Sequence, residues 1–407
     1  MKHLSFIYSL FALVFILGCD RIGDNKLEDN PKEIIELTRS EAECNSVSRS
    51  FAASILESVN SASGGKSFFI SPMSIEFALG LLANGAAGES REQILKALGT
   101  NDLESLNSYS RTMLSYLPTM DKKSRLSLAN LALFNSSVSI NKDYKKSVEN
   151  FYDAEVTNMD FSQSQKAISY VNKWASEKTN GTINKLIDDM PNQVCFLANA
   201  IYFKGLWKDK FENTSKENFY LENGEKIKVK MMKTTKELSY CGYDNFNVLF
   251  IPYGNGSFNM VVILPDEGYK IDDIIPKVKH AMTSGLQSPN NSGRSVLTKV
   301  PVFKCESKID LTGPLSRMGV TSIFTKGNAD FSNMTPSNNV FVNTLLQKSY
   351  ISVNEKGTEA AAVTYAAVDG MSRVPEIGEF IADRPFLYCI IETATRAVLF
   401  AGRYSGE

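Results

Sequence analysis

Histidine is almost absent from this chain, because His3 and His280 are the two in 407 residues. His3 lies in an N-terminal export signal, so a Ser-His or Cys-His hydrolase would have to be built on His280 alone. A site with several histidine ligands is excluded in the mature chain for the same reason. His280 has no nucleophile motif nearby, and we interpret it as a surface helix residue. We therefore expect no enzyme, no metal and no cofactor; a lipoprotein hydrolase that uses His280 is the enzyme alternative.

Cysteine is scarce as well. The six cysteines are Cys19, Cys44, Cys195, Cys241, Cys305 and Cys389. Removal of Cys19 with the signal leaves an odd five, so at least one is unpaired, and the pairing of the others stays open. No C-x-x-C spacing suggests a metal or redox site. Cys195 and Cys389 lie in apolar runs, where buried free thiols are expected.

The chain also lacks an excess of either charge. Its 44 Lys and Arg residues balance 45 Asp and Glu residues, which gives a net charge of -1. Nucleic-acid-binding proteins usually carry a basic surface, and a balanced composition argues against one here. We expect no nucleic-acid partner, and we expect a monomer.

The N-terminus carries an export signal. Lys2 precedes an apolar run over residues 4–17, and the run ends in Ile16-Leu17-Gly18-Cys19. This motif resembles the lipobox of bacterial lipoproteins, which implies cleavage before Cys19 and lipidation of its thiol. The alternative is an ordinary signal peptide with a chance cysteine. We expect a signal peptide at 1–18, a lipidated cysteine and flexible tether at 19–38, and one domain at 39–407. The protein would then be exported and lipid-anchored in a bacterial cell envelope, in the periplasm or at the surface.

Hydrophobic periodicity predicts a mixed α+β body with a large, mainly antiparallel sheet. Ser71 and Pro72 fit the N-cap and first turn of a helix, and Asn255-Gly256 fits a hairpin turn. Residues 194–203 are almost wholly apolar, which predicts a central strand covered on both faces. We expect helices at 39–59, 72–85, 88–98, 165–179 and 311–318, and strands at 67–70, 127–134, 194–203, 248–252, 258–264, 295–303, 340–353, 385–391 and 397–403.

Residues 355–375 have an unusual alternating pattern. One set of alternate positions is small or β-branched: Thr358, Ala360, Ala362, Thr364, Ala366 and Val368. The other set holds Glu359, Tyr365 and Asp369. This period of two fits a strand, although an Ala-rich helix or a polar loop bracketed by Gly357 and Gly370 fits as well.

The chain from about residue 40 to 403 resembles the serpin family. The resemblance is carried by FFISPMSIEFALGLLANGAAGES from Phe68, LANLALF from Leu128, LANAIYFKGLWKDKF from Leu197, VLFIPYGNGSFNMVVILP from Val248, VNEKGTEAAA from Val353 and DRPFLYCIIETATRAVLFAGR from Asp383. It implies three β-sheets, eight or nine helices and an exposed reactive-centre loop at about 355–380.

The resemblance also assigns individual residues. The hinge of inhibitory members matches Glu355, Lys356, Gly357, Thr358, Glu359, Ala360, Ala361 and Ala362. The family's usual count places the reactive bond between Met371 and Ser372. Ser71 and Ser74 match the shutter serines under the central sheet. Gln347 stands where many members have histidine, so the shutter hydrogen bonds are expected to differ.

These assignments imply a suicide-type inhibitor of serine proteases, with cysteine proteases as a second class of partner. The cleaved loop would enter the central sheet as a new strand. Met371 favours elastase-like or chymotrypsin-like targets, while Arg373 offers trypsin-like enzymes another bond. A non-inhibitory member that acts as a binding or chaperone module is the alternative. Lipid on Cys19 would add a membrane contact.

Overall fold

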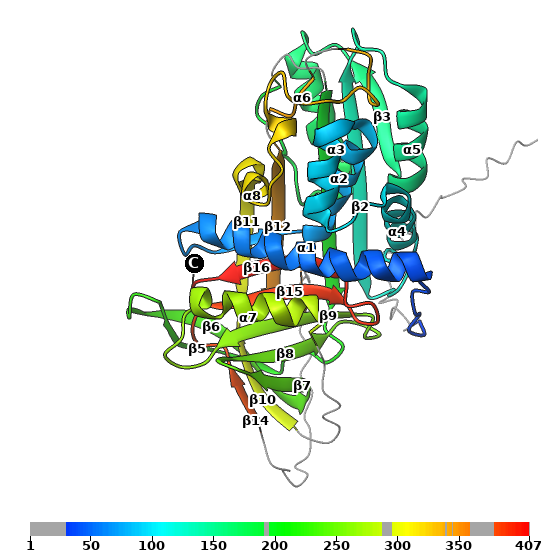
Figure 1. Cartoon of the computed structure of the whole chain (residues 1–407). Coiled ribbons are helices and arrows are strands. Elements are labelled where there is room, and N and C mark those ends of the chain that lie inside the picture. Colours follow the sequence, from blue (N-terminus) through cyan, green and yellow to red (C-terminus); the bar gives the residue numbers. More distant parts are fainter. Residues whose placement is uncertain are drawn as a thin grey trace, which may run out of the picture.

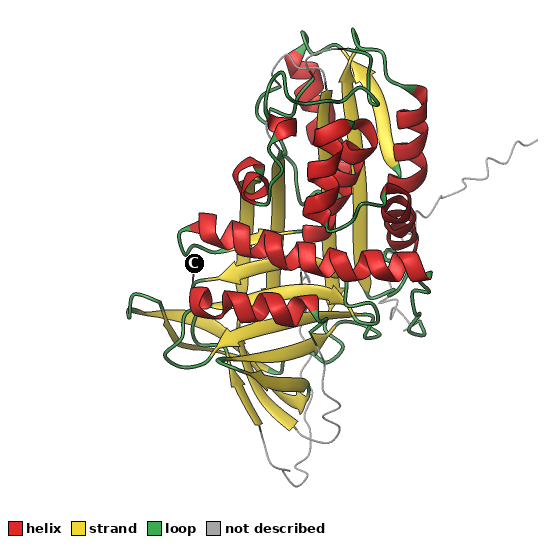
Figure 2. Cartoon of the chain, viewed as in Figure 1, coloured by secondary structure: helices red, strands yellow, loops and turns green. Residues whose placement is uncertain are grey.

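The computed structural model describes residues 30–190, 195–286, 295–337, 340–343, 345–358 and 378–406. Within these ranges the chain forms eight α-helices, one short 3-10 helix and three β-sheets (Figures 1 and 2). The helices are α1 (Arg39–Ser63), α2 (Pro72–Gly85), α3 (Gly88–Leu98), α4 (Leu103–Tyr116), α5 (Lys142–Tyr152), α6 (Ser164–Lys178), α7 (Ile271–Thr283), α8 (Thr312–Arg317) and η1 (Ser322–Phe324). The predicted α+β class is confirmed.

The large sheet has six strands in the order β11-β12-β13-β4-β2-β3. They are β11 (Phe303–Asp310), β12 (Leu346–Asn354), β13 (Gly357–Thr358), β4 (Cys195–Leu206), β2 (Ser124–Asn135) and β3 (Ala154–Met159). Every pair except β2 with β3 is antiparallel. The central place predicted for residues 194–203 is confirmed, but cover on both faces holds for residues 200–203 alone, since the start of β4 is half-buried.

The other two sheets form the second half of the body. One has the order β1-β16-β15-β9-β8-β7, and the other has the order β14-β10-β6-β5. Their strands are β1 (Phe68–Ile70), β5 (Asn213–Tyr220), β6 (Lys226–Glu237), β7 (Ser239–Tyr243), β8 (Phe246–Pro252), β9 (Phe258–Pro265), β10 (Ser295–Pro301), β14 (Gly378–Ile381), β15 (Phe386–Glu392) and β16 (Val398–Tyr404). The predicted hairpin of β8 and β9 is confirmed.

The helices cover the sheets from different sides. Figure 1 shows α1 and α7 side by side across β15 and β16, with α2 beside β2 in the other half of the molecule. Helix α6 packs on the outer face of the large sheet, where Val171 and Trp174 meet Leu131 and Ala200 in a separate apolar cluster. Helices thus shield both faces of the large sheet.

Two predicted strands were wrong in extent. The strand predicted at 295–303 is divided, because β10 ends at Pro301 and β11 begins at Phe303 in a different sheet. Val302 N donates to Lys230 O at 2.7 Å where the chain changes sheets. The strand predicted at 340–353 begins only at Leu346. Val340 and Leu345 are buried, but the apolar residues before Leu346 pack as irregular chain.

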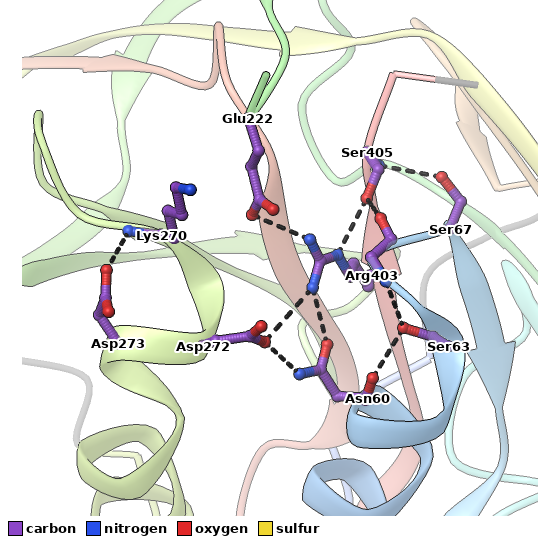
Figure 3. A network of polar contacts seen from close by, with 10 residues as sticks. Asn60, Ser63, Ser67, Glu222, Lys270, Asp272, Asp273, Arg403 and Ser405 are labelled. Atoms are coloured by element: carbon purple, nitrogen blue, oxygen red, sulfur yellow. Dashed lines mark hydrogen bonds and ion pairs between the residues drawn. The ribbon is translucent and has the colours of Figure 1, made fainter. Parts of the chain in front are cut away.

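A buried arginine joins the last strand to three other elements (Figure 3). Arg403 is 1% exposed, and its Nη2 lies 2.9 Å from Glu222 Oε1 in the turn between β5 and β6. Its Nη1 donates to Asn60 Oδ1 of α1 at 3.0 Å and lies 3.6 Å from Asp272 Oδ1 of α7. Its Nε donates to Ser405 Oγ at 2.9 Å. The network holds the chain end against α1 and α7.

Several smaller expectations can be compared with the structure. His280 is exposed on α7, as predicted. Cys389 is a buried free thiol, as predicted, whereas Cys195 is free but half-buried. Among the described helices, none has the length and apolar character needed to cross a bilayer.

Candidate functional site

The site is the hinge at the point where a chain segment enters the large sheet. Gly357 and Thr358 form β13, a strand of two residues between β12 and β4. Thr358 is opposite Val353 on one side and Gly205 on the other. In the part of the chain that the structure describes, backbone pairing links β12 to β4 through β13, and the two strands also lie close to each other. The first two residues of a strand are therefore already paired between β12 and β4.

Both residues of β13 fit their positions closely. Thr358 is 1% exposed, and its Oγ1 is 2.6 Å from Tyr253 Oη. Burial raises the pKa of Tyr253, so its phenol stays protonated and can donate to the threonine. Gly357 has φ +151°, and a Cβ there would lie 2.0 Å from Gly205 O. Only glycine fits this approach of two backbones.

The chain before β13 is held by residues that follow β4. Trp207 N donates to Lys356 O at 2.9 Å, and Trp207 Nε1 donates to Asn354 O at 2.8 Å. The indole stacks on Tyr253 with ring centroids 4.4 Å apart. Glu355 accepts from Phe211 N through its carbonyl oxygen at 3.0 Å, and its carboxylate lies 3.5 Å from Lys230 Nζ.

The segment that follows β13 ends in another sheet. Residues 359–377 lie outside the described ranges, and they include the predicted hinge residues Glu359, Ala360, Ala361 and Ala362 and the predicted reactive bond at Met371 and Ser372. Cys19 also lies outside them. The chain resumes as β14, an edge strand that pairs in parallel with β10. Residues 359–377 therefore connect the hinge in the large sheet to the edge of the four-stranded sheet.

Below the hinge, two of the three predicted shutter residues meet directly. Ser71 N donates to Gln347 Oε1 at 2.8 Å, and Gln347 Nε2 donates back to Ser71 O at 3.1 Å. Ser71 Oγ caps α2 by accepting from Ser74 N at 3.1 Å, and it donates to Leu399 O at 2.6 Å. An amide side chain offers a donor and an acceptor at once, so Gln347 satisfies both backbone groups of Ser71.

The third shutter residue contacts a different strand. Ser74 Oγ hydrogen-bonds Asn199 Oδ1 on β4, and Asn199 Nδ2 donates to Asn130 Oδ1 on β2 at 2.6 Å. Asn130 Nδ2 continues the chain to Tyr152 O at 2.6 Å. Helix α2 is thus bonded to β12 through Ser71 and to β4 through Ser74, the two strands that flank β13. Both asparagines were missed from the sequence, although each interrupts an apolar strand in a Leu-Ala-Asn motif.

The same helix carries a buried acid whose titration can be tested. Glu76 is 3% exposed, accepts from Ser48 Oγ at 2.5 Å, and has its pKa raised by burial from 4.5 to about 7. A raised pKa means that the folded state binds the proton more tightly, so stability falls as pH rises from about 4.5 to 7. We expect Glu76→Gln to raise the free energy of unfolding, measured in urea, by about 3 kcal/mol at pH 8, and to leave it nearly unchanged at pH 4.5.

The control for this prediction is Glu36→Gln, a change at an exposed glutamate. It should leave the free energy of unfolding unchanged at both pH 8 and pH 4.5. A gain from Glu76→Gln that is equal at both pH values would show that Glu76 is not protonated differently in the folded and unfolded states.

Comparisons with known proteins agree with this geometry. The family described as "Serpin (serine protease inhibitor)" matches residues 46–406. The leukocyte elastase inhibitor of Equus caballus is 32% identical over 370 residues, which cover 87% of this chain and 97% of the relative.

Two solved structures of one thermophilic serpin, tengpin, are also similar. Its native state has a TM-score of 0.82 at 28% identity and covers 93% of this chain and 97% of its own. Its latent state has a TM-score of 0.77 at 28% identity and covers 92% and 99%. The family match spans the hinge, the shutter and all three sheets, so this chain belongs to the serpin family of protease inhibitors.

Proposed function

We propose that this chain traps serine proteases by a suicide mechanism, in which cleavage at Met371–Ser372 releases the loop into the large sheet. The observation that carries the proposal is β13, which holds Thr358 in register between β12 and β4. A strand that continues β13 would find hydrogen-bonding edges on both sides. The burial of Thr358 supports an inhibitory member over a binding or chaperone module, since the hinge is already seated.

The loop sequence supports the same step. The alternate residues from Thr358 to Val368 are small or β-branched, as a strand that packs on a dense interior requires. Roughly ten new backbone hydrogen bonds at about 1 kcal/mol each would release on the order of 10 kcal/mol. This is comparable to the stability of a whole domain, and it is available to displace and distort a protease held by its acyl bond.

The position of cleavage sets the target class. Met371 fits the medium-sized apolar pockets of elastase-like and chymotrypsin-like enzymes, and the name of the horse relative is in line with an elastase-like target. After treatment with pancreatic elastase, intact mass spectrometry should find a C-terminal fragment of 36 residues, from Ser372 to Glu407. A fragment that begins elsewhere would overturn this assignment, and a stable complex with trypsin together with a fragment that begins at Val374 would favour trypsin-like targets through Arg373.

The protein is further proposed to be exported and held in a bacterial envelope by lipid on Cys19. The supporting feature is the Ile16-Leu17-Gly18-Cys19 motif after an apolar run. We expect wild type to partition into the detergent phase of a Triton X-114 extraction, and Cys19→Ser to partition into the aqueous phase. Equal partitioning of both proteins would remove the anchor.

A further inference from the structure

Two cations face each other on the outer side of the large sheet, next to the hinge. Arg125 on β2 is directly opposite Lys204 on β4. Like charges in this arrangement destabilise a sheet. Arg125 Nη1 donates to Asn180 Oδ1 at 3.3 Å, and neither cation has an ion pair within the described ranges. The repulsion between them is therefore not offset by a carboxylate in the described part of the protein.

A third cation lies in the same row of the sheet. Lys304 on β11 is exposed and is opposite Ser352 on β12. It too has no ion pair with a described residue. Across the sheet, this row consists of Arg125 on β2, Lys204 on β4, the position that would follow Thr358 in β13, Ser352 on β12 and Lys304 on β11.

The register of β13 determines which residue would occupy the position between Lys204 and Ser352. Thr358 is opposite Gly205 and Val353. One further residue in the same register would lie opposite Lys204 on one side and Ser352 on the other, and residue 359 is a glutamate. Because strand residues alternate between faces and Thr358 is buried, residue 359 would point outward, toward the cations.

We propose that Arg125, Lys204 and Lys304 form a docking site for the carboxylate of Glu359, which occupies it when the loop enters the large sheet. Residues directly opposite on neighbouring strands have Cβ atoms about 5 Å apart, within reach for an ion pair between Glu359 and Lys204. An attraction that forms as the loop enters the sheet favours insertion over hydrolysis of the acyl bond. The inference rests on the inhibitory function proposed above.

The same register also places a residue of suitable chemistry at the shutter, the contact between α2 and the strands β4 and β12. Continued to residue 364, it places Thr364 between Asn199 and Gln347, on the inward face. These are the polar side chains that β4 and β12 direct toward α2. A threonine hydroxyl suits that position better than an apolar side chain, because it can hydrogen-bond both amides. At two positions of the register, 359 and 364, the loop residue thus suits the side chains that it would face on β4 and β12.

A charge swap tests the docking site. Lys204→Glu should raise the number of inhibitor molecules consumed per protease trapped about fivefold at low salt, the factor that corresponds to about 1 kcal/mol. The added change Glu359→Lys should restore the wild-type value. Lys208→Glu, at an exposed cation just beyond β4, is the matched control and should stay within about twofold of wild type. Intact Lys204→Glu should melt no lower than wild type, because it places a carboxylate opposite Arg125.

A separate measurement distinguishes failure of this site from failure of the proposed function. Wild type nicked in its loop by a non-target protease should melt at a higher temperature than intact protein. If nicking gives no rise, the loop does not insert, and both proposals are overturned. If nicking raises the melting temperature but Lys204→Glu traps protease as efficiently as wild type, or the swap fails to restore trapping, the docking site alone is overturned.

Discussion

Replacement of Thr358 by arginine is expected to convert the inhibitor into a substrate. Thr358 is 1% exposed in β13, where its hydroxyl is bonded to Tyr253. An unpaired guanidinium in that place would cost several kcal/mol to bury, so the hinge could not seat between β4 and β12. Slow insertion leaves time for the acyl bond to be hydrolysed. At equal molar ratio with elastase, we expect complex to fall at least tenfold on a denaturing gel, while cleavage at Met371 continues.

The matched control is Thr358→Ser, which keeps the hydroxyl and adds no bulk. It should form complex at a level close to wild type. Abundant complex with Thr358→Arg would mean that the seating of Thr358 in β13 is not needed for trapping, and the account of the hinge would be wrong.

Replacement of Arg403 by methionine is expected to destabilise the whole domain. The change removes the shared partner of Glu222, Asn60 and Ser405, and it leaves the Asn60 amide oxygen and the half-buried carboxylate of Glu222 without their cation. Removal of a buried charged partner lowers the free energy of unfolding by on the order of 3 kcal/mol. The urea midpoint of unfolding should fall accordingly.

Two variants separate the contributions in this network. Arg403→Lys retains the charge but not the planar fork of donors, so its midpoint should lie between those of wild type and Arg403→Met. Asp272→Asn should change little, because the Asp272 side chain is 74% exposed. A midpoint for Arg403→Met within experimental error of wild type would contradict a structural role for the network.

Local signals in the sequence predicted part of the fold to the residue. Ser71-Pro72 set the start of α2, and the predicted bounds of the helices at 72–85 and 88–98 match the structure. Capping and helical periodicity act within one turn, so they can be read without knowledge of the fold. Helix α4 had such a signal as well, in the N-cap Asp102 and the spacing of Leu106, Tyr109 and Met113, and it was missed.

Not every missed element had a local signal to read. Strand β5 is largely exposed, so no buried face marks it as a strand. Strand β6 did have a signal, since Ile227, Val229 and Met231 alternate with lysines and Val229 and Met231 are buried, and it was missed. Val340 and Leu345 show the opposite case, since both are buried although neither lies in a strand. Burial alone therefore does not specify a strand, because the ladder also depends on which segment lies alongside.

The candidate site was predictable mainly through family resemblance. The resemblance located Ser71, Ser74, Gln347 and the hinge, and the structure brings Ser71 and Gln347 together. It did not reveal that Gln347 replaces the expected partner with two reciprocal hydrogen bonds to the Ser71 backbone. Tyr253 and Trp207 were missed because their contacts with the hinge join residues more than 100 positions apart.

The most direct test of the account is to mix the intact protein with pancreatic elastase at equal molar ratio and analyse the products by denaturing electrophoresis and mass spectrometry. We expect a covalent complex of protease and inhibitor that survives denaturation, together with a released fragment of 36 residues that begins at Ser372. Cleaved protein and free, active protease, with no complex at any ratio across elastase-like and chymotrypsin-like enzymes, would contradict it.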